Sequence, residues 1–238
     1  MDWYVANDMT ANVLWINQQN GTFVDQAVVS GIAFDGIGNG QASMGIVVAD
    51  IDDNQLEDIF VTHLNGETNT LYLQTESSLF EVATHPFGLG RSSFAETGFG
   101  VVALDFENDG DLDFAIVNGK VTLSTDTEPR TAVSSGLEAY AQRNHLYLRQ
   151  TQDKFVTVDD SDFSSRRLTT RGLAAGDIDS DGDVDLLLNN ANAAAELWIN
   201  DAATTGHWIE LKATLPQFGN RDATGALALN QVTSYRAK

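Results

Sequence analysis

The chain has 238 residues, 42% of them hydrophobic, so it can bury a sizeable core and is not expected to be disordered. Its formal net charge of −21 argues against nucleic-acid and anionic-membrane partners, which are bound by basic patches. The absence of cysteine excludes a disulfide framework and thiol chemistry.

The opening Met1-Asp2-Trp3 has neither the basic region nor the apolar region of a signal peptide, so this chain shows none. No apolar run approaches the roughly 20 residues of a membrane-spanning helix. We therefore expect no membrane insertion.

Three short apolar segments open the chain, and each has the punctuation of a β-strand. They are "DWYVAN" (2–7), "NVLWIN" (12–17) and "TFVD" (22–25).

Three acidic loops follow, each between two strand-like segments. A glycine-led apolar segment precedes every loop, as in "GIVVAD", "GVVALD" and "GLAAGD", and an apolar segment follows, as in "DIFVT", "DFAIV" and "DLLLN". The loops are "DIDDNQLED" (50–58), "DFENDGDLD" (105–113) and "DIDSDGDVD" (177–185).

Aligned, the loops share oxygen-bearing side chains at positions 1, 3, 5 and 9, the kind of ligand that Ca²⁺ takes. These candidates are Asp50, Asp52, Asn54 and Asp58; Asp105, Glu107, Asp109 and Asp113; and Asp177, Asp179, Asp181 and Asp185. Position 7 adds Leu56, Asp111 and Asp183 to the candidate metal set. Position 6 is Gly110 or Gly182 in two loops, as a turn with positive φ requires, but Gln55 in the first.

The alternative interpretation of each run is a solvated acidic loop. Crowded carboxylates repel one another unless a cation lies among them, and three aligned copies favour calcium, about three ions in all. They are not EF-hands, because position 12 is Val61, Ile116 or Leu188 instead of glutamate, and the flanks are strand-like instead of helical.

Two further strands recur in four repeats, three of which follow an acidic loop. The first carries Trp15, Tyr72, Tyr147 or Trp198 in one column, and the second carries Phe23, Phe80, Phe155 or Trp208. We interpret these aromatic side chains as core packing in preference to ligand stacking.

Four short antiparallel strands repeated in this way describe an all-β fold, a β-propeller with about four blades in this chain. The polar segment 119–143 is expected to be an excursion from the third repeat.

The segment "GFGVVALDFENDGDLDFAIVNG" resembles an FG-GAP/VCBS repeat, the blade unit of integrin-α-like propellers. The segments "YAQRNHLYLRQTQDKF" and "GHWIELKATLPQFGNRDATGALAL" resemble the cartilage acidic protein group, in which such repeats precede an ASPIC/UnbV segment. The resemblance implies calcium at loop positions 1, 3, 5 and 9 and an extracellular, periplasmic or cell-surface location. Family propellers are larger, typically with seven or more blades.

We therefore expect propeller blades over 1–206 and an ASPIC/UnbV-like segment over 207–238. The first blade lacks its inner strand and acidic loop, which leaves Asp2 as an orphan of a lost loop. "GALALNQV" (225–232) has the shape of that missing strand and is expected to close the ring. The alternatives are a fragment of a larger propeller, and two chains that share one ring.

The favoured function is a non-catalytic recognition or adhesion module whose partner is a protein or a glycan. A lectin could stack sugars on Trp3, Phe94 or Tyr140, which lie outside the repeated aromatic columns. A polysaccharide lyase would need a proton-abstracting base and a cation for the substrate carboxylate. Its candidates are His63, His85, Arg91, Tyr140, Arg143 and His145, which follow no common pattern and are interpreted as structural.

Overall fold

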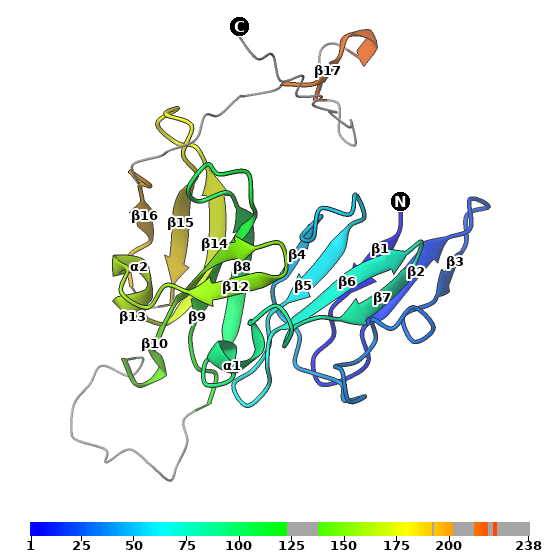
Figure 1. Cartoon of the computed structure of the whole chain (residues 1–238), viewed down its shortest axis with the longest axis horizontal. Coiled ribbons are helices and arrows are strands. Elements are labelled where there is room, and N and C mark those ends of the chain that lie inside the picture. Colours follow the sequence, from blue (N-terminus) through cyan, green and yellow to red (C-terminus); the bar gives the residue numbers. More distant parts are fainter. Residues whose placement is uncertain (123–137, 192, 202–211, 219–220, 223–238) are drawn as a thin grey trace, which may run out of the picture. The chain divides into compact units, whose positions relative to one another are not determined.

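The computed structural model describes residues 1–122, 138–191, 193–201, 212–218 and 221–222 (Figure 1). The chain divides into two compact units, Met1–His207 and Trp208–Lys238. In the second unit, the described residues form an antiparallel pair, β17 (Thr214–Leu215) and β18 (Arg221–Asp222), joined through the short helix η2 (Pro216–Phe218).

The first unit begins with a three-stranded antiparallel sheet in the order β1-β2-β3. Its strands are β1 (Trp3–Val5), β2 (Val13–Asn17) and β3 (Phe23–Asp25). These are the three strand-like segments that open the sequence.

Two four-stranded antiparallel sheets follow, in the orders β4-β5-β6-β7 and β8-β9-β11-β12. Their strands are β4 (Ile46–Ala49), β5 (Asp58–Val61), β6 (Thr70–Glu76), β7 (Leu79–Val82), β8 (Gly98–Leu104), β9 (Asp113–Asn118), β11 (His145–Thr151) and β12 (Lys154–Thr157). Each is one complete blade of the expected kind.

The fourth sheet has the order β14-β15-β16, with strands β14 (Thr170–Gly176), β15 (Asp185–Asn190) and β16 (Glu196–Trp198). Short elements lie between the sheets: helices α1 (Gly90–Ser93), η1 (Glu138–Tyr140) and α2 (Asp162–Ser165), and the paired strands β10 (Gln142–Arg143) and β13 (Arg167–Leu168). Among the described residues, no helix is long and apolar enough to cross a membrane.

Equivalent strands keep the same register in every sheet. Trp3 faces Trp15 across β1 and β2, as Ile59 faces Tyr72 across β5 and β6. The chain is thus all-β and built of repeated antiparallel sheets of the β-propeller type, which confirms the predicted fold class.

Three hydrophobic clusters join the sheets in sequence, because side chains on the two faces of a strand alternate. One cluster joins the first and second sheets through Leu14 and Tyr72. The next joins the second and third through Phe60 and Phe114, whose rings stack with centroids 4.5 Å apart. The last joins the third and fourth through Leu146 and Leu186.

The aromatic columns are core in the middle sheets but not in the first. Tyr72, Tyr147 and Phe155 are buried, as expected. The expectation of core packing is wrong for Trp15 and Phe23, which are 40% and 41% exposed. In the described part of the chain, the face of the first sheet that carries them has no sheet packed against it.

The two ends of the segment 119–143 are paired with each other. Gly119 and Ala141 form a β-bridge, and the backbone N–H of Lys120 donates to Tyr140 O at 2.9 Å. Residues 123–137 lie outside the described residues, as do "HWIE" (207–210) and the proposed closing strand 225–232. Ring closure within the chain and the 206/207 domain boundary stay predictions.

Candidate metal centre

The three acidic loops connect the first and second strands of the second, third and fourth sheets: β4 to β5, β8 to β9 and β14 to β15. Each loop therefore joins two hydrogen-bonded strands, whose pairing fixes the positions of both loop ends. Equivalent positions in the three loops can be compared directly.

The position 9 aspartates are the buried members of each loop. Asp58, Asp113 and Asp185 have at most 1% of their surface exposed. Each accepts two backbone N–H groups, one from loop position 2 and one from the third strand of the same sheet or, for Asp185, from the residue two positions after that strand. The donors to Asp58 are Ile51 (2.7 Å) and Gln74 (2.8 Å). Those to Asp113 are Phe106 (3.0 Å) and Arg149 (2.8 Å), and those to Asp185 are Ile178 (2.8 Å) and Asn200 (2.9 Å).

Asp2 retains half of this arrangement in the first sheet. Its Oδ1 accepts the backbone N–H of Asn17 at 2.9 Å, and Asn17 is the counterpart of Gln74 in the third strand position. Asp2 therefore connects the first two strands of this sheet, as the position 9 aspartates connect strands in the other sheets. The sequence pattern suggested only its lost metal role.

The position 1 aspartates fold the loops back on themselves. Asp50 accepts the N–H groups of Asn54 at 3.0 Å and Gln55 at 2.9 Å, and Asp105 accepts those of Asp109 at 3.0 Å and Gly110 at 2.9 Å. Asp177 likewise accepts those of Ser180 at 2.7 Å and Gly182 at 3.1 Å. These hydrogen bonds hold the backbone of each loop curled around its position 1 carboxylate.

Position 6 is left-handed in all three loops, with φ of 97° at Gly110, 95° at Gly182 and 68° at Gln55. Glycine adopts this conformation without strain, whereas a residue with a Cβ does not. The first loop therefore keeps the backbone shape that the sequence suggested, and Gln55 carries the strain.

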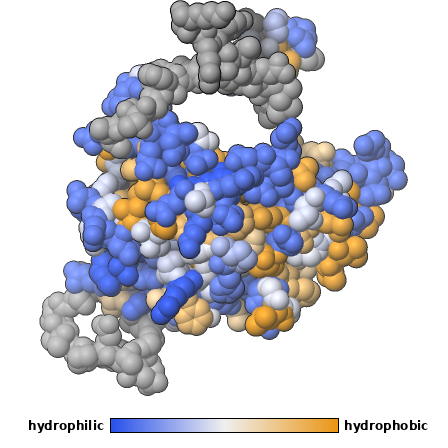
Figure 2. All heavy atoms as spheres, viewed as in Figure 1, coloured by the Kyte–Doolittle hydropathy of each residue, from blue (hydrophilic) through white to orange (hydrophobic). Residues whose placement is uncertain are grey.

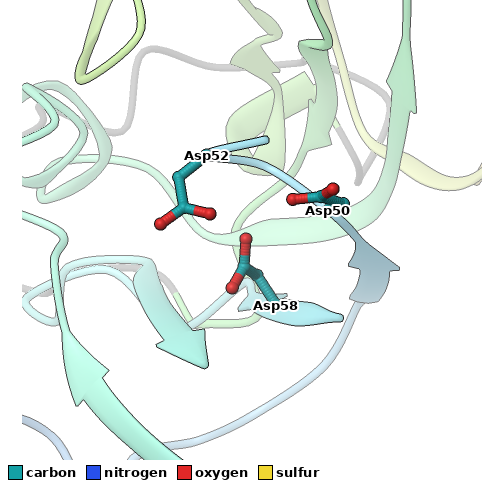
Figure 3. A group of neighbouring side chains, drawn as sticks. All are labelled: Asp50, Asp52 and Asp58. Carbon is teal, nitrogen blue, oxygen red and sulfur yellow. The ribbon is translucent and has the colours of Figure 1, made fainter. Parts of the chain in front are cut away.

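Carboxylates converge in the first and third loops. Asp50, Asp52 and Asp58 offer one oxygen each within 4.8 Å of one another, and so do Asp177, Asp179 and Asp185. Figure 3 shows the carboxylates of the first group turned toward a common space. In the second loop, position 3 is the longer Glu107, and its side chain does not complete such a group in the described structure.

Burial makes the negative charge of these loops costly. It raises the pKa of Asp58, and together with the charges of Glu107 and Asp109 it raises the pKa of Asp113 to about 7, although two N–H bonds oppose the shift. Burial and the charges of Asp109 and Asp105 also raise the pKa of Glu107. A cation among these oxygens would remove that cost.

Neighbouring loops are joined sideways by side chains that the sequence did not single out. Arg149, with 1% of its side chain exposed, donates to Asp53 Oδ2 at 2.9 Å and lies 3.6 Å from Asp111 Oδ1, so it connects the first and second loops. Asn108 donates to Asp183 Oδ1 at 2.6 Å and connects the second and third. The three loops therefore lie together at one end of the sheets.

A cavity of about 830 Å³ lies at the opposite end of the strands of the second sheet. Its walls come from the segment between β3 and β4, the β5–β6 loop and the segment between β7 and β8. Because the strands are antiparallel, these connections lie at the end of the sheet opposite the acidic β4–β5 loop. Its polar and aromatic lining includes Asp35, Asn39, Glu67, Thr68, His85 and Phe94.

The candidate residues for sugar or lyase chemistry do not gather in one place. Phe94, 54% exposed, lines the cavity with His85, whereas Trp3 lies on the outer face of the first sheet. His63 and His145 are buried, and burial lowers the pKa of each to about 4. Arg143 and His145 both lie 3.8 Å from Glu96, and Arg91 and Tyr140 belong to α1 and η1.

With this geometry in place, the chain was compared with known proteins. Residues 50–116 match the FG-GAP-like repeat family. The matched segment runs from the first acidic loop through the second and into β9. The FG-GAP/VCBS resemblance is thus confirmed for this part of the chain, and the narrower ASPIC/UnbV resemblance stays a prediction.

A search of curated proteins found no similar sequence. Among solved structures, a lectin from Agrocybe aegerita, described as specifically recognising non-reducing terminal N-acetylglucosamine, aligns with 14% identity and a TM-score of 0.48. The alignment covers 84% of this chain and 46% of the lectin chain, so this chain spans less than half the length of that protein.

Proposed function

We propose that the chain is a calcium-binding β-propeller module that recognises a partner without catalysing a reaction. The observation that carries the proposal is the repeated loop in which a buried aspartate, held by two N–H groups, faces other carboxylates. No basic side chain of the described residues lies between Asp50, Asp52 and Asp58, so a bound cation is the natural neutraliser.

The donor set fits calcium. Ca²⁺ takes six to eight oxygen ligands at about 2.3–2.6 Å, so two ligands of one ion lie at most about 5 Å apart. In the first and third loops, three carboxylate oxygens lie within 4.8 Å of one another and so meet that limit. Positions 1, 3, 5 and 9 would supply side-chain oxygens and position 7 a backbone carbonyl, which gives about three ions for the three loops.

The calcium sites would hold the first hairpin of each blade together and stabilise the loop end of the sheets. Bound calcium offsets the repulsion among carboxylates, and Arg149 and Asn108 transmit the order of one loop to the next. The role of the metal in this proposal is structural, and no reacting group of a substrate needs to approach it.

An extracellular, periplasmic or cell-surface location follows from the same proposal. Calcium sites in extracellular modules have dissociation constants of roughly 10⁻⁴–10⁻³ M, and they fill only where calcium is abundant. The repeat found at 50–116 supports adhesion or recognition as the task, and the narrower predicted resemblance to the cartilage acidic protein group agrees with it.

Calorimetric titration with calcium tests the metal sites directly. We expect about three ions per chain for the unmodified protein and the loss of one binding step in Asp185→Ala. The matched control is Asp160→Ala, because Asp160 is an exposed acidic residue outside the loops. If no calcium heat is observed, or if both variants lose the same step, the proposal fails.

The polar cavity supports a second candidate, glycan binding. Its lining combines carboxylate and amide groups with an exposed aromatic ring, which suits the hydroxyl groups and C–H faces of a sugar. A glycan array in calcium buffer tests this, and binding should fall in Phe94→Ala but not in Ile178→Ala, an exposed apolar residue in the third acidic loop. Unsaturated uronide absorbance with acidic polysaccharides would instead reveal a lyase.

A further inference from the structure

Each inner joint of the propeller uses the same columns of side chains. Toward the preceding sheet, the second and third sheets present aligned residues from their second, third and fourth strands. In the second sheet these are Ile59, Val61, Tyr72 and Phe80, and in the third Phe114, Ile116, Tyr147 and Phe155. Both sets belong to the hydrophobic clusters that join consecutive sheets.

The same columns of the first sheet are occupied by Trp3, Val5, Trp15 and Phe23. These side chains are 59%, 38%, 40% and 41% exposed, and together they line an open apolar hollow. The first sheet therefore presents a blade-packing surface that no other described sheet covers. We name this surface the leading face.

The fourth sheet presents the complementary surface. Leu146 and Leu148 of the third sheet pack toward the fourth. Their counterparts in the fourth sheet are Leu197 and Ile199, which are 52% and 46% exposed, beside Leu187 at 49%. We name the surface formed by Leu187, Leu197 and Ile199 the trailing face.

The two faces match as halves of one blade joint. In the joint between the second and third sheets, aliphatic Leu71 and Leu73 meet aromatic Phe114, Tyr147 and Phe155. A trailing face of leucine and isoleucine against a leading face of two tryptophans and a phenylalanine repeats that chemistry. Figure 2 shows hydrophobic atoms at the surface over both the fourth and the first sheet.

Both faces are exposed in the first unit, and no contact among its described residues joins them to each other. From this we infer that a second copy of the chain docks its leading face on the trailing face of the first, and that the reciprocal contact closes a ring of two chains. Two head-to-tail joints related by a twofold axis form a closed assembly. Four sheets from each chain give eight blades, within the four to eight that are typical of propellers.

Charge makes this assembly dependent on calcium. Each chain has a formal net charge of −21, so two chains repel each other, and bound calcium lowers that repulsion. The dimer is therefore expected to be strongest when the acidic loops are filled, and to weaken in chelator at low ionic strength.

Sedimentation equilibrium of the full chain in millimolar calcium tests the inference. The expected mass at micromolar concentration is twice the 25.7 kDa of one chain. Trp15→Glu and Leu197→Asp should each give the single-chain mass, because each destroys one half of every joint. The control is Val29→Glu, since Val29 is 79% exposed outside both faces and its substitution should leave the dimer intact. Far-UV circular dichroism confirms that every variant is folded.

Mixing the two monomeric variants distinguishes head-to-tail docking from pairing of identical faces. Trp15→Glu keeps its trailing face and Leu197→Asp keeps its leading face, so the mixture should form a dimer that neither variant forms alone. The inference is overturned by a single-chain mass for the unmodified protein, which would mean that another part of the chain or another protein covers the faces. It is equally overturned by an open-ended series of larger species, or by a Leu197→Asp variant that remains dimeric.

Discussion

At the residue scale, the position 9 aspartates combine a structural role in the sheets with the metal-ligand role that we propose for the loops. Asp58, Asp113 and Asp185 are buried, and each joins its loop to the third strand of its own sheet or to the segment directly after that strand. Their remaining lone pairs are available to a cation, since a carboxylate has about four acceptor sites. Loss of such a side chain therefore removes both a metal ligand and a strand anchor.

The raised pKa of Asp113 predicts a pH dependence in chelator. Its pKa is about 7 in the folded chain and about 3.9 when unfolded, so between these values the folded state binds more protons. Stability due to this group is present below about pH 4 and is lost as the pH rises toward 7. Thermal melts in chelator should show that the unmodified protein loses stability relative to Asp113→Asn as the pH rises from about 4 to 7. Parallel pH profiles would contradict the buried, uncompensated carboxylate.

Arg149 gives a second prediction at this scale. Arg149→Met removes the cation between Asp53 and Asp111, so chelated protein should lose roughly 1–3 kcal/mol of unfolding free energy, less than for a fully buried pair because both acids are partly exposed. Calcium should reduce the loss, because the metal also neutralises the loops. Urea unfolding measures it, with Arg143→Met as the control, whose more exposed and longer ion pairs predict a loss below about 1 kcal/mol. Equal losses in the two variants would show that Arg149 does not couple the loops.

At the element scale, the sequence predicted the strands and loops well and their lateral contacts poorly. The aligned aromatic positions identify the strands, and the acid at every second position identifies the loops, each from neighbouring residues alone. The positive φ of Gln55 followed from its alignment with Gly110 and Gly182. Arg149 and Asp53 are 96 residues apart, so only the packing of neighbouring sheets brings them together. The exposure of Trp15 was missed because column alignment reports the kind of side chain and not whether a partner sheet is present.

The strained backbone of Gln55 predicts the order of calcium affinity among the three acidic loops. Its left-handed backbone costs roughly 1–2 kcal/mol relative to glycine, about tenfold in affinity, so the loop at 50–58 should bind calcium most weakly. It also offers three carboxylates and Asn54 where each of the others offers four. Gln55→Gly should raise the affinity of the weakest step up to about tenfold in calorimetric titration, and Asp58→Ala should remove that step. The ranking is wrong if Asp58→Ala removes a tighter step than Asp185→Ala does.

The glycines that lead the inner strands give a packing prediction. A Cβ on Gly45 would lie 2.0 Å from Phe99 O in the next sheet, so Gly45→Ala should destabilise the protein by about 3 kcal/mol or more, as a core clash does. Gly172 holds the equivalent place in β14, and its Cβ would meet only Asn189 Cβ, at 3.3 Å. Urea unfolding of Gly172→Ala should therefore show a much smaller loss. Equal losses would mean that close approach of neighbouring sheets does not explain the glycine column.

At the scale of the whole molecule, the chain combines an acidic loop end, a polar cavity at the other end of the second sheet and two apolar outer faces. A formal charge of −21 is tolerable in a folded chain when cations lie among the densest carboxylates. We propose that calcium binding, blade stability and ring assembly are linked through the same loops. The central claim is that calcium stabilises the folded propeller.

Thermal unfolding across a calcium titration tests that claim most directly, with magnesium at equal ionic strength as the control for non-specific charge screening. A ligand bound only by the folded state stabilises it by RT ln(1 + [L]/Kd) for each site, so the melting temperature should rise steadily with calcium and fall markedly in chelator. Magnesium, which demands tighter octahedral geometry, should have a much smaller effect. Melting curves that coincide in calcium, magnesium and chelator would contradict the account.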